Sequence, residues 1–124
     1  MIITNHLNVI PNVTLTGSIT AFELLEPSGD GSMSAHKVFI PPDEAYPPHT
    51  HPAAHVIAIL SGNGTVEMGD ADDIEFASIG PGDMFLVPAN VRHRVGAGPD
   101  GMIMLAVSVA SLPLIDPNRL VVVS

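Results

Sequence analysis

The sequence predicts an all-β domain, and three observations support this fold class. The chain of 124 residues contains 11 glycines and 12 prolines, and the turn signals that they form recur every several residues. The segments between these turns are short and rich in Val, Ile, Phe and Thr, which favour strands. No long amphipathic helix pattern is present. Short strands separated by closely spaced turns are typical of a β-sandwich or β-barrel.

Eight strands are expected, each bounded by residues that favour turns. They cover residues 18–25, 33–40, 55–61, 64–68, 73–78, 84–87, 92–95 and 102–109, and one further turn is expected at 27–31. The Asn63-Gly64 pair after residue 62 predicts a hairpin, because Asn and Gly tolerate positive φ. The acidic run at 70–73 is interpreted as a solvated hairpin turn rather than a site for a hard cation.

Two of the predicted strands are apolar on both faces. Residues 56–60 and 102–107 have no polar residue at either parity, whereas a strand that is exposed on one side alternates. Both faces of these strands are therefore expected to be covered. The interpretation that we favour is a homodimer, in which a second subunit supplies one cover. The tail at 120–123 and a second sheet of the same chain are the alternatives.

The composition excludes several functional classes. The 13 acidic and 4 basic residues give a net charge of −9, and so few cations cannot neutralise a nucleic-acid backbone or hold an anionic membrane surface. The absence of cysteine excludes disulfide scaffolds, thiolate metal sites and cysteine nucleophiles. The length fits a single domain over residues 1–124.

Neither a membrane span nor a secretory signal is expected. No apolar run reaches the roughly 18 residues that a spanning helix needs, because the longest candidate, residues 102–115, is interrupted by serine and proline. The N-terminal segment has no basic region and no clear cleavage site. We therefore expect a cytoplasmic protein whose partner, apart from a second subunit, is a small-molecule substrate.

The densest chemical signal is a group of histidines. His49, His51 and His55 fall within seven residues, and the prolines around them favour an extended backbone. On a strand, His49 and His51 share one face. His55 opens the next apolar strand and meets them if that strand folds back. His93 follows a turn, a short strand and a proline turn, and a hairpin there would return it to the other three.

Four converging imidazoles predict a mononuclear metal site. The expected cofactor is one divalent transition metal, with Fe or Mn favoured and Zn, Ni or Cu as alternatives. Four neutral ligands leave the +2 charge uncompensated, which favours an anionic group such as hydroxide, a carboxylate or an enolate. An octahedral ion would keep two positions open for a bidentate substrate, or for a substrate and dioxygen.

These residues resemble the two signature motifs of the cupin superfamily. The first motif, at about residues 43–62, is usually written G-x5-HxH-x3,4-E-x6-G, and its two histidines and last glycine match. Here His55 stands in place of the glutamate and Asp43 in place of the first glycine. The second motif, at about residues 82–97, is usually written G-x5-P-x-G-x2-H-x3-N. Its first glycine, proline and histidine match, while Asn90 replaces the second glycine and an alanine replaces the final asparagine.

The resemblance implies a single-domain cupin, a small β-barrel or jelly roll with one metal inside its mouth. The histidine in place of glutamate resembles the four-histidine group of this superfamily, which implies His49, His51, His55 and His93 as ligands. Family activities include those of dioxygenases, decarboxylases, isomerases, cyclases and lyases, and some members only bind a ligand. The fold therefore leaves the activity open.

Two further residues are candidates for catalytic roles. If Lys37 faces outward, His36 faces the barrel interior, where it would carry protons or bind a substrate anion. Alternatively, it is a half-exposed strand histidine. Tyr46 lies in the segment that leads to His49, interpreted as a loop, and would orient the substrate or serve only in packing.

The first hypothesis for the function is a dioxygenase-type oxidoreductase that acts on a small oxygenated organic substrate. The second is Lewis-acid chemistry without redox change, as in an isomerase, cyclase, decarboxylase or lyase. The third is a cupin that binds a metal or ligand and has no turnover.

Overall fold

The computed structural model describes residues 3–25, 33–109 and 120–123, so the expected turn at 27–31 lies outside the described residues. A short 3-10 helix, η1 (His6–Asn8), precedes the strands. The strands are β1 (Val13–Thr16), β2 (Ile19–Leu25), β3 (Met33–Ile40), β4 (Ala45–Thr50), β5 (His55–Ser61), β6 (Gly64–Met68), β7 (Glu75–Ile79), β8 (Met84–Val87), β9 (His93–Ala97), β10 (Met102–Val109) and β11 (Val121–Val122).

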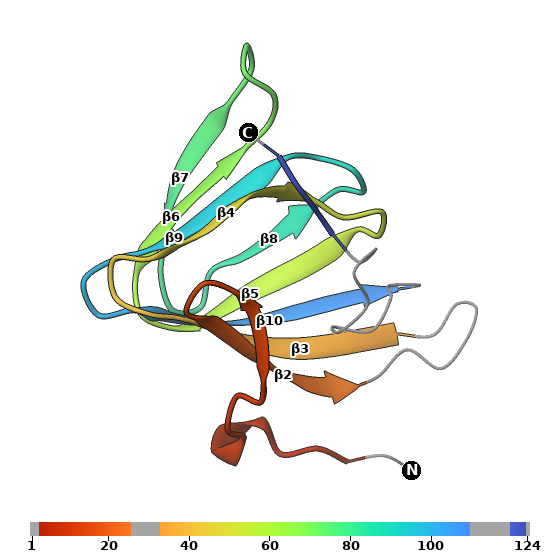
Figure 1. Ribbon diagram of the computed structural model, residues 1–124, viewed down its shortest axis with the longest axis vertical. Helices are drawn as coiled ribbons and strands as arrows, with labels where there is room; N and C mark the ends of the chain where they lie inside the picture. The colour runs from red at the N-terminus through yellow and green to blue at the C-terminus, as the bar shows by residue number, and fades with distance from the viewer. Residues whose placement is uncertain (1–2, 26–32, 110–119, 124) are drawn as a thin grey trace.

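Two antiparallel sheets form the fold (Figure 1). One sheet has the strand order β1-β2-β3-β10-β5-β8, and the other has the order β11-β4-β9-β6-β7. The sheets face each other across a shared apolar core, and the β6–β7 hairpin projects at the top of the view in Figure 1. This arrangement confirms the predicted all-β jelly roll.

The positions of turn-forming residues predicted the limits of most strands. The expected strands at 33–40, 55–61, 64–68, 84–87 and 102–109 match β3, β5, β6, β8 and β10 at both ends. The strands expected at 73–78 and 92–95 correspond to β7 and β9, whose limits differ from the expected ones by up to two residues. The strands β1, β4 and β11 were not among those predicted. In β4 the adjacent prolines cannot donate to a ladder, and the pairing with β9 is irregular between Tyr46 and His49.

Two of the predicted hairpins, the one at Asn63-Gly64 and the one that was to return His93 to the site, are absent from the structure. The segment after Ser61 carries the chain from the first sheet to the second, because β5 pairs with β10 and β8 while β6 pairs with β7 and β9. Likewise, β8 and β9 belong to different sheets, so His93 reaches the interior through a crossing between sheets. The acidic hairpin turn is confirmed: β6 and β7 pair directly, and Asp70, Asp72 and Asp73 are exposed at their junction.

Strand alternation explains the segments that are apolar on both faces. In β5, Ile57 and Ile59 point into the core, where the second sheet covers them. The outward residues of the same strand, such as Val56, remain partly exposed. The tail does not cover them, because β11 joins the other sheet beside β4. Within the described residues, one face is therefore covered by the same chain and the other is not.

Membrane-spanning helices are absent from the part of the chain that the structure describes. The helix that it contains, η1, has three residues and is far too short to cross a bilayer.

Candidate metal centre

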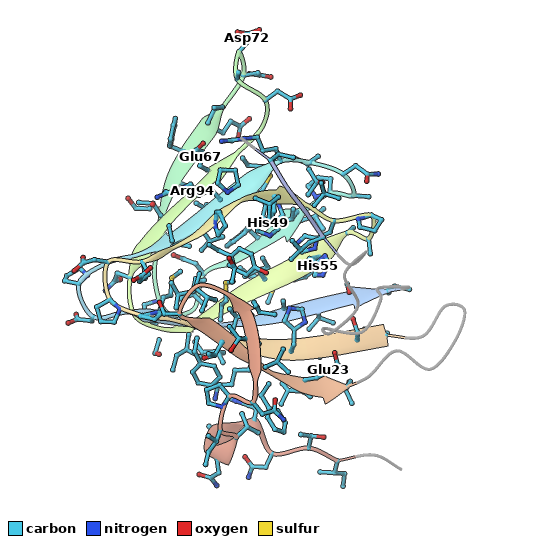
Figure 2. All side chains as sticks on the ribbon, viewed as in Figure 1. Glu23, His49, His55, Glu67, Asp72 and Arg94 are labelled. Carbon is cyan, nitrogen blue, oxygen red and sulfur yellow. The ribbon has the colours of Figure 1, made fainter. Side chains whose placement is uncertain are left out.

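The four histidines of the predicted site come from both sheets. His49 lies on β4 directly opposite His93, the first residue of β9. His51 follows the end of β4, and His55 opens β5 in the facing sheet. Figure 2 shows His49 and His55 between the sheets, while Asp72 lies at the tip of the distant β6–β7 hairpin. The fold therefore assembles residues that are up to 44 positions apart in sequence.

The geometry of the group suits a metal ion. One ring nitrogen from each of His49, His51 and His93 lies within 4.8 Å of the others. The ring of His55 adjoins this trio, with its centroid 4.3 Å from that of His51. Nitrogens that bind one ion at about 2.1 Å lie at most about 4.2 Å apart, so a small inward movement would complete coordination. All four side chains are between 1% and 6% exposed.

Backbone carbonyls set the orientation of three of the imidazoles. In His49, His55 and His93, Nδ1 contacts the carbonyl oxygen two residues earlier, at 2.7, 2.9 and 3.0 Å respectively. A carbonyl oxygen can only accept, so Nδ1 carries the proton and the lone pair lies on Nε2. Metal-binding histidines commonly have their second ring nitrogen held in this way. His55 shares this arrangement with His49 and His93, although it lies outside the tightest trio.

Burial keeps at least one of these rings neutral. Desolvation lowers the pKa of His93 below its ordinary value of 6.5, and the hydrogen bond to Val91 opposes that shift only in part. A neutral imidazole is the form that binds a metal. At neutral pH, His93 is therefore already in the state that coordination requires.

The lowered pKa predicts a pH-dependent stability of the metal-free protein. Above pH 6.5 His93 is neutral in both the folded and the unfolded chain, so it does not make the free energy of unfolding depend on pH. As the pH falls below that value, the unfolded chain takes up a proton that the folded protein resists, so the free energy of unfolding decreases. Thermal melts of chelator-treated protein should show this loss, and the loss should be smaller in His93→Gln. An equal loss in His93→Gln and the wild type would contradict it, and His6→Gln serves as a control outside the site.

The histidines surround a small enclosed cavity of about 20 Å³. A cavity needs roughly 10–15 Å³ to hold one water molecule, so this one has room for a single ion or water. No carboxylate lines it. The lining residues are His36, Val38, Tyr46, His49, His51, His55, Ile57, His93, Val95, Met104 and Ala106.

A much larger groove of about 690 Å³ lies elsewhere. It includes Arg94, Thr65 and Ser78, which stand on the outer face of the second sheet, and no histidine lines it. We place the candidate site at the smaller cavity, because that is where the potential ligands converge.

The two candidate catalytic residues both line the small cavity. Of the two alternatives for His36, the structure has the inward one, with its ring centroid 6.1 Å from that of His55. Tyr46 belongs to strand β4 rather than to a loop, and its ring stacks on His49 with centroids 4.3 Å apart. Lys37 points to the opposite side, where its Nζ donates to the carbonyl of His6 at 2.7 Å. His6 is thus outside the site.

Sequence reasoning missed Glu23. It lies on β2 directly opposite His36, so it is the acidic residue that the sheet register brings beside the cavity wall. Figure 2 shows it on the side of the first sheet. Its position follows from the pairing of β2 with β3, and a pattern within either strand alone gives no signal of it.

Comparison with known families decides the classification. The sequence profile of the family described as Cupin domain matches residues 36–109, which is more than half of the chain. The chain belongs to the cupin family. The matched segment contains all four histidines of the site and both candidate catalytic residues. None of the curated proteins that were compared matches this cupin significantly.

Solved structures share the fold of this cupin. The dimethylsulfoniopropionate (DMSP) lyase DddQ from Ruegeria pomeroyi DSS-3 is 22% identical, with a TM-score of 0.73 over 91% of this chain and 60% of the lyase. The polyketide cyclase RemF from Streptomyces resistomycificus is 23% identical, with a TM-score of 0.73 over 100% of this chain and 87% of the cyclase. An oxalate decarboxylase variant from B. subtilis is 18% identical, with a TM-score of 0.74 over 91% of this chain and 30% of that protein.

The chain spans about 60% and 53% of the two DMSP lyases that it resembles. At these identities the likeness concerns the fold alone. The cupin family supplies the expectation of a metal, and the histidine cluster is the observation in this chain that fits one.

Two of the four departures from the cupin motifs have a backbone explanation. Asp43 and Asn90, which replace motif glycines, have φ of 60° and 62°, and they are the non-glycine residues with positive φ in the described part of the chain. Asp and Asn are the residues that tolerate this left-handed conformation best after glycine. The N–H of Asn90 also donates to the carbonyl of His51 at 2.7 Å. This turn therefore holds the chain next to a candidate ligand.

Replacing Asn90 tests that explanation. Asn90→Ala should destabilise the fold by about 1–2 kcal/mol, because alanine pays the full cost of the left-handed conformation. Asn90→Gly should be neutral or slightly stabilising. Denaturant unfolding of both variants measures the difference, and equal stability of the two would contradict the explanation.

Proposed function

We propose that this cupin is a mononuclear metalloenzyme, and that its metal is held by Nε2 of His49, His51, His55 and His93. The observation that carries the proposal is the convergence of four buried imidazoles, three of them oriented by backbone carbonyls, on a cavity of ionic size. Surface histidines have no need of such orientation. The residues present therefore fit a divalent transition metal, with Fe or Mn preferred.

The most specific form of the proposal is a dioxygenase-type oxidoreductase acting on a small oxygenated organic substrate. A bound Fe or Mn would supply both Lewis acidity and a redox couple. The proposed ligands are neutral and no carboxylate lines the cavity. The substrate group that binds the metal would therefore preferably be an anion, such as an enolate, phenolate or carboxylate. The apolar side chains Val38, Ile57 and Val95 exclude water and strengthen these electrostatic interactions.

Substrate size is limited by the same wall. The cavity is too small for an organic molecule, so side chains that line it must move when a substrate binds. Met104 is the lining residue best suited to this, because its unbranched side chain has three rotatable bonds. We therefore infer a compact substrate.

His36 and Tyr46 have distinct roles in this proposal. His36 lies at the cavity on β3 and is positioned to take a proton from an entering enol or phenol. Tyr46 stacks on His49 and holds that ring in the plane that its ligand role requires. Tyr46 is thus a positioning residue, and His36 is the candidate general base.

A second candidate is Lewis-acid chemistry without redox change. The similarity of fold to a lyase, a cyclase and a decarboxylase favours this class. It would use the same four ligands, with Zn, Mn or Ni, and the same proton-accepting residue. A cupin that binds a metal without turnover is the remaining alternative.

Metal analysis followed by oxygen consumption separates these candidates. Protein purified without added metal is first analysed for Fe, Mn, Cu, Ni and Zn. Fe- and Mn-loaded protein is then assayed in an oxygen electrode with small diketones and catechols, with His36→Gln as the variant and His6→Gln as the matched control. Oxygen uptake that depends on His36 supports the dioxygenase. No uptake with either metal would overturn it, and turnover of such compounds without oxygen would favour the Lewis-acid class.

A further inference from the structure

The groove of about 690 Å³ on the second sheet has a floor of small residues. The registers of β4, β9, β6 and β7 align Ala45, Gly96, Thr65 and Ser78 in one row across the outer face. A Cβ on Gly96 would lie 3.4 Å from Nη1 of Arg94, 3.5 Å from Oγ1 of Thr65 and 3.7 Å from Cβ of Ala45. The missing side chain therefore leaves a recess among these three residues. Small-molecule sites typically have volumes of roughly 300–1,000 Å³, so the groove is of suitable size.

Arg94 supplies a positive charge that is available to a ligand. Its direct neighbour across the β6–β9 ladder is Glu67 (Figure 2). The carboxylate of Glu67 is paired with Arg92 instead, whose Nη1 donates to it at 2.9 Å. Within the part of the chain that the structure describes, Arg94 has neither a hydrogen bond nor an ion pair. Its guanidinium lies beside the recess at Gly96, and a planar guanidinium matches a carboxylate with two parallel hydrogen bonds.

The end of the groove beyond this recess is acidic. The N–H of Asp43 donates to the carbonyl of Gly98 at 3.0 Å, and the N–H of Ala97 donates to the carbonyl of Glu44 at 2.8 Å. These two bonds hold the start of β4 beside the end of β9. The side chains of Asp43 and Glu44 are exposed there and line the groove.

Asp83 lines the same end from the turn between β7 and β8. Its Oδ2 accepts from the N–H of Gly80 at 2.7 Å. Gly80 in turn adjoins Asn63, since a Cβ on Gly80 would lie 2.5 Å from Oδ1 of that residue. The carbonyl of Asn63 accepts from the N–H of Gly98 at 2.7 Å, so this turn reaches the end of β9. One guanidinium and three carboxylates line the groove, which gives it a net charge of −2.

This separation of charge limits the class of ligand. A phosphate or a dicarboxylate would meet repulsion from the three carboxylates, whereas a molecule with one negative and one positive end would satisfy both ends of the groove. Gly96 and Gly98 are two residues apart on one side of the groove, a distance of roughly 7 Å along an extended backbone. Six single bonds of about 1.5 Å span roughly 7 Å in an extended zigzag. Six bonds separate the carboxylate carbon of 6-aminohexanoate or lysine from its distal ammonium nitrogen.

We propose that the groove on the outer face of the second sheet binds a free ω-amino acid of this length. Its carboxylate would lie on Arg94 beside the hydroxyls of Thr65 and Ser78, and its distal ammonium would lie between Glu44 and Asp83. The groove shares no lining residue with the histidine cavity, so this site stands apart from the proposed metal site.

Titration of the full ¹⁵N-labelled chain with 6-aminohexanoate, followed by amide chemical shifts, tests the site. The shifts should saturate and map to the residues around Gly96 and Glu44. Hexanoate and hexylamine each lack one of the two charges and should bind at least about 10-fold more weakly. Added sodium chloride should weaken binding, because salt screens exposed charges with a Debye length of about 10 Å at 0.1 M.

Four variants assign the contacts. Arg94→Gln should lower the affinity for 6-aminohexanoate at least about 10-fold. Lys37→Gln removes the same charge from the first sheet and, as the matched control, should bind like the wild type. Glu44→Gln should lower the affinity for 6-aminohexanoate but not that for hexanoate. Gly96→Ala should also weaken binding, because the added methyl group fills the recess at ordinary contact distances.

Thermal melts establish that each variant is folded, and Gly96→Ala decides the question if Arg94→Gln does not fold. Shifts that do not saturate would overturn the proposal, as would hexanoate binding as tightly as 6-aminohexanoate. Wild-type affinity in a folded Arg94→Gln variant would overturn it too. Shifts confined to the residues around the histidine cavity would place the ligand elsewhere and contradict it. Metal content, measured on the same samples, reports on the proposed metal site separately.

Discussion

Removing the His55 ring is expected to reduce metal affinity by more than the 10–100-fold that follows the loss of a partner outside the coordination sphere. The reason is that His55→Ala deletes one of four proposed ligands, and no carboxylate lines the cavity to replace it. His55 is the informative position, because His49, His51 and His93 already form a close trio without it. Competition with a chelator, followed by elemental analysis, measures the effect.

Restoring the commoner cupin residue provides the matched variant. His55→Glu places a carboxylate where the family motif has glutamate, so it should retain metal while His55→Ala loses it. His6→Ala, outside the site, should bind metal like the wild type. Unchanged metal content in His55→Ala would show that His55 is not a ligand. Far-UV circular dichroism must show that each variant is folded.

Adding one methyl group at Gly62 is expected to cost several kcal/mol of folding free energy. Gly62 has a φ of +79°, and a Cβ there would fall on the carbonyl oxygen of Gly101. The close approach is between two backbone segments, so no side chain can rotate away. Backbone strain of about 1–2 kcal/mol would add to an overlap cost of about 1–3 kcal/mol. Urea unfolding of Gly62→Ala measures the sum.

Gly82 is the control that separates the two causes. It also matches a motif glycine and has a φ of +91°, but a Cβ there meets nothing within 4 Å. Gly82→Ala should therefore cost only the conformational strain of about 1–2 kcal/mol. Equal losses in the two variants would show that the contact with Gly101 is unimportant. A larger loss at Gly62 would show that the motif requires glycine there for space.

Local signals account for what could be predicted of the fold. Strands such as β3, β5 and β10 are bounded by turn residues, and their limits depend on chemistry within a few positions. The crossings after Ser61 and Val87 were mistaken for hairpins because a turn has the same composition whether the next strand pairs locally or joins the other sheet. That choice depends on contacts with β9 and β10, which are distant in sequence.

The site shows the same division between local and distant information. The spacing of His49, His51 and His55 is local, and it was sufficient to predict an inward group. His93 was added from the turns and the short strand before it, and the motif resemblance agreed, although the hairpin that was expected to return it is absent. The cavity volume, the stacking of Tyr46 and the position of Glu23 beside His36 all depend on register between strands, so no pattern in the sequence indicates them.

The carbonyl contacts of His49, His55 and His93 have a consequence for how a metal would be taken up. In zinc fingers, the ligands are disordered until the ion binds, so binding and folding are one event. Here each of these rings is anchored to its own chain two residues back, within a folded barrel. Little conformational entropy remains to be lost, and the site is preorganised. Loss of the ion should therefore leave a folded protein with an intact cavity, ready to exchange one metal for another.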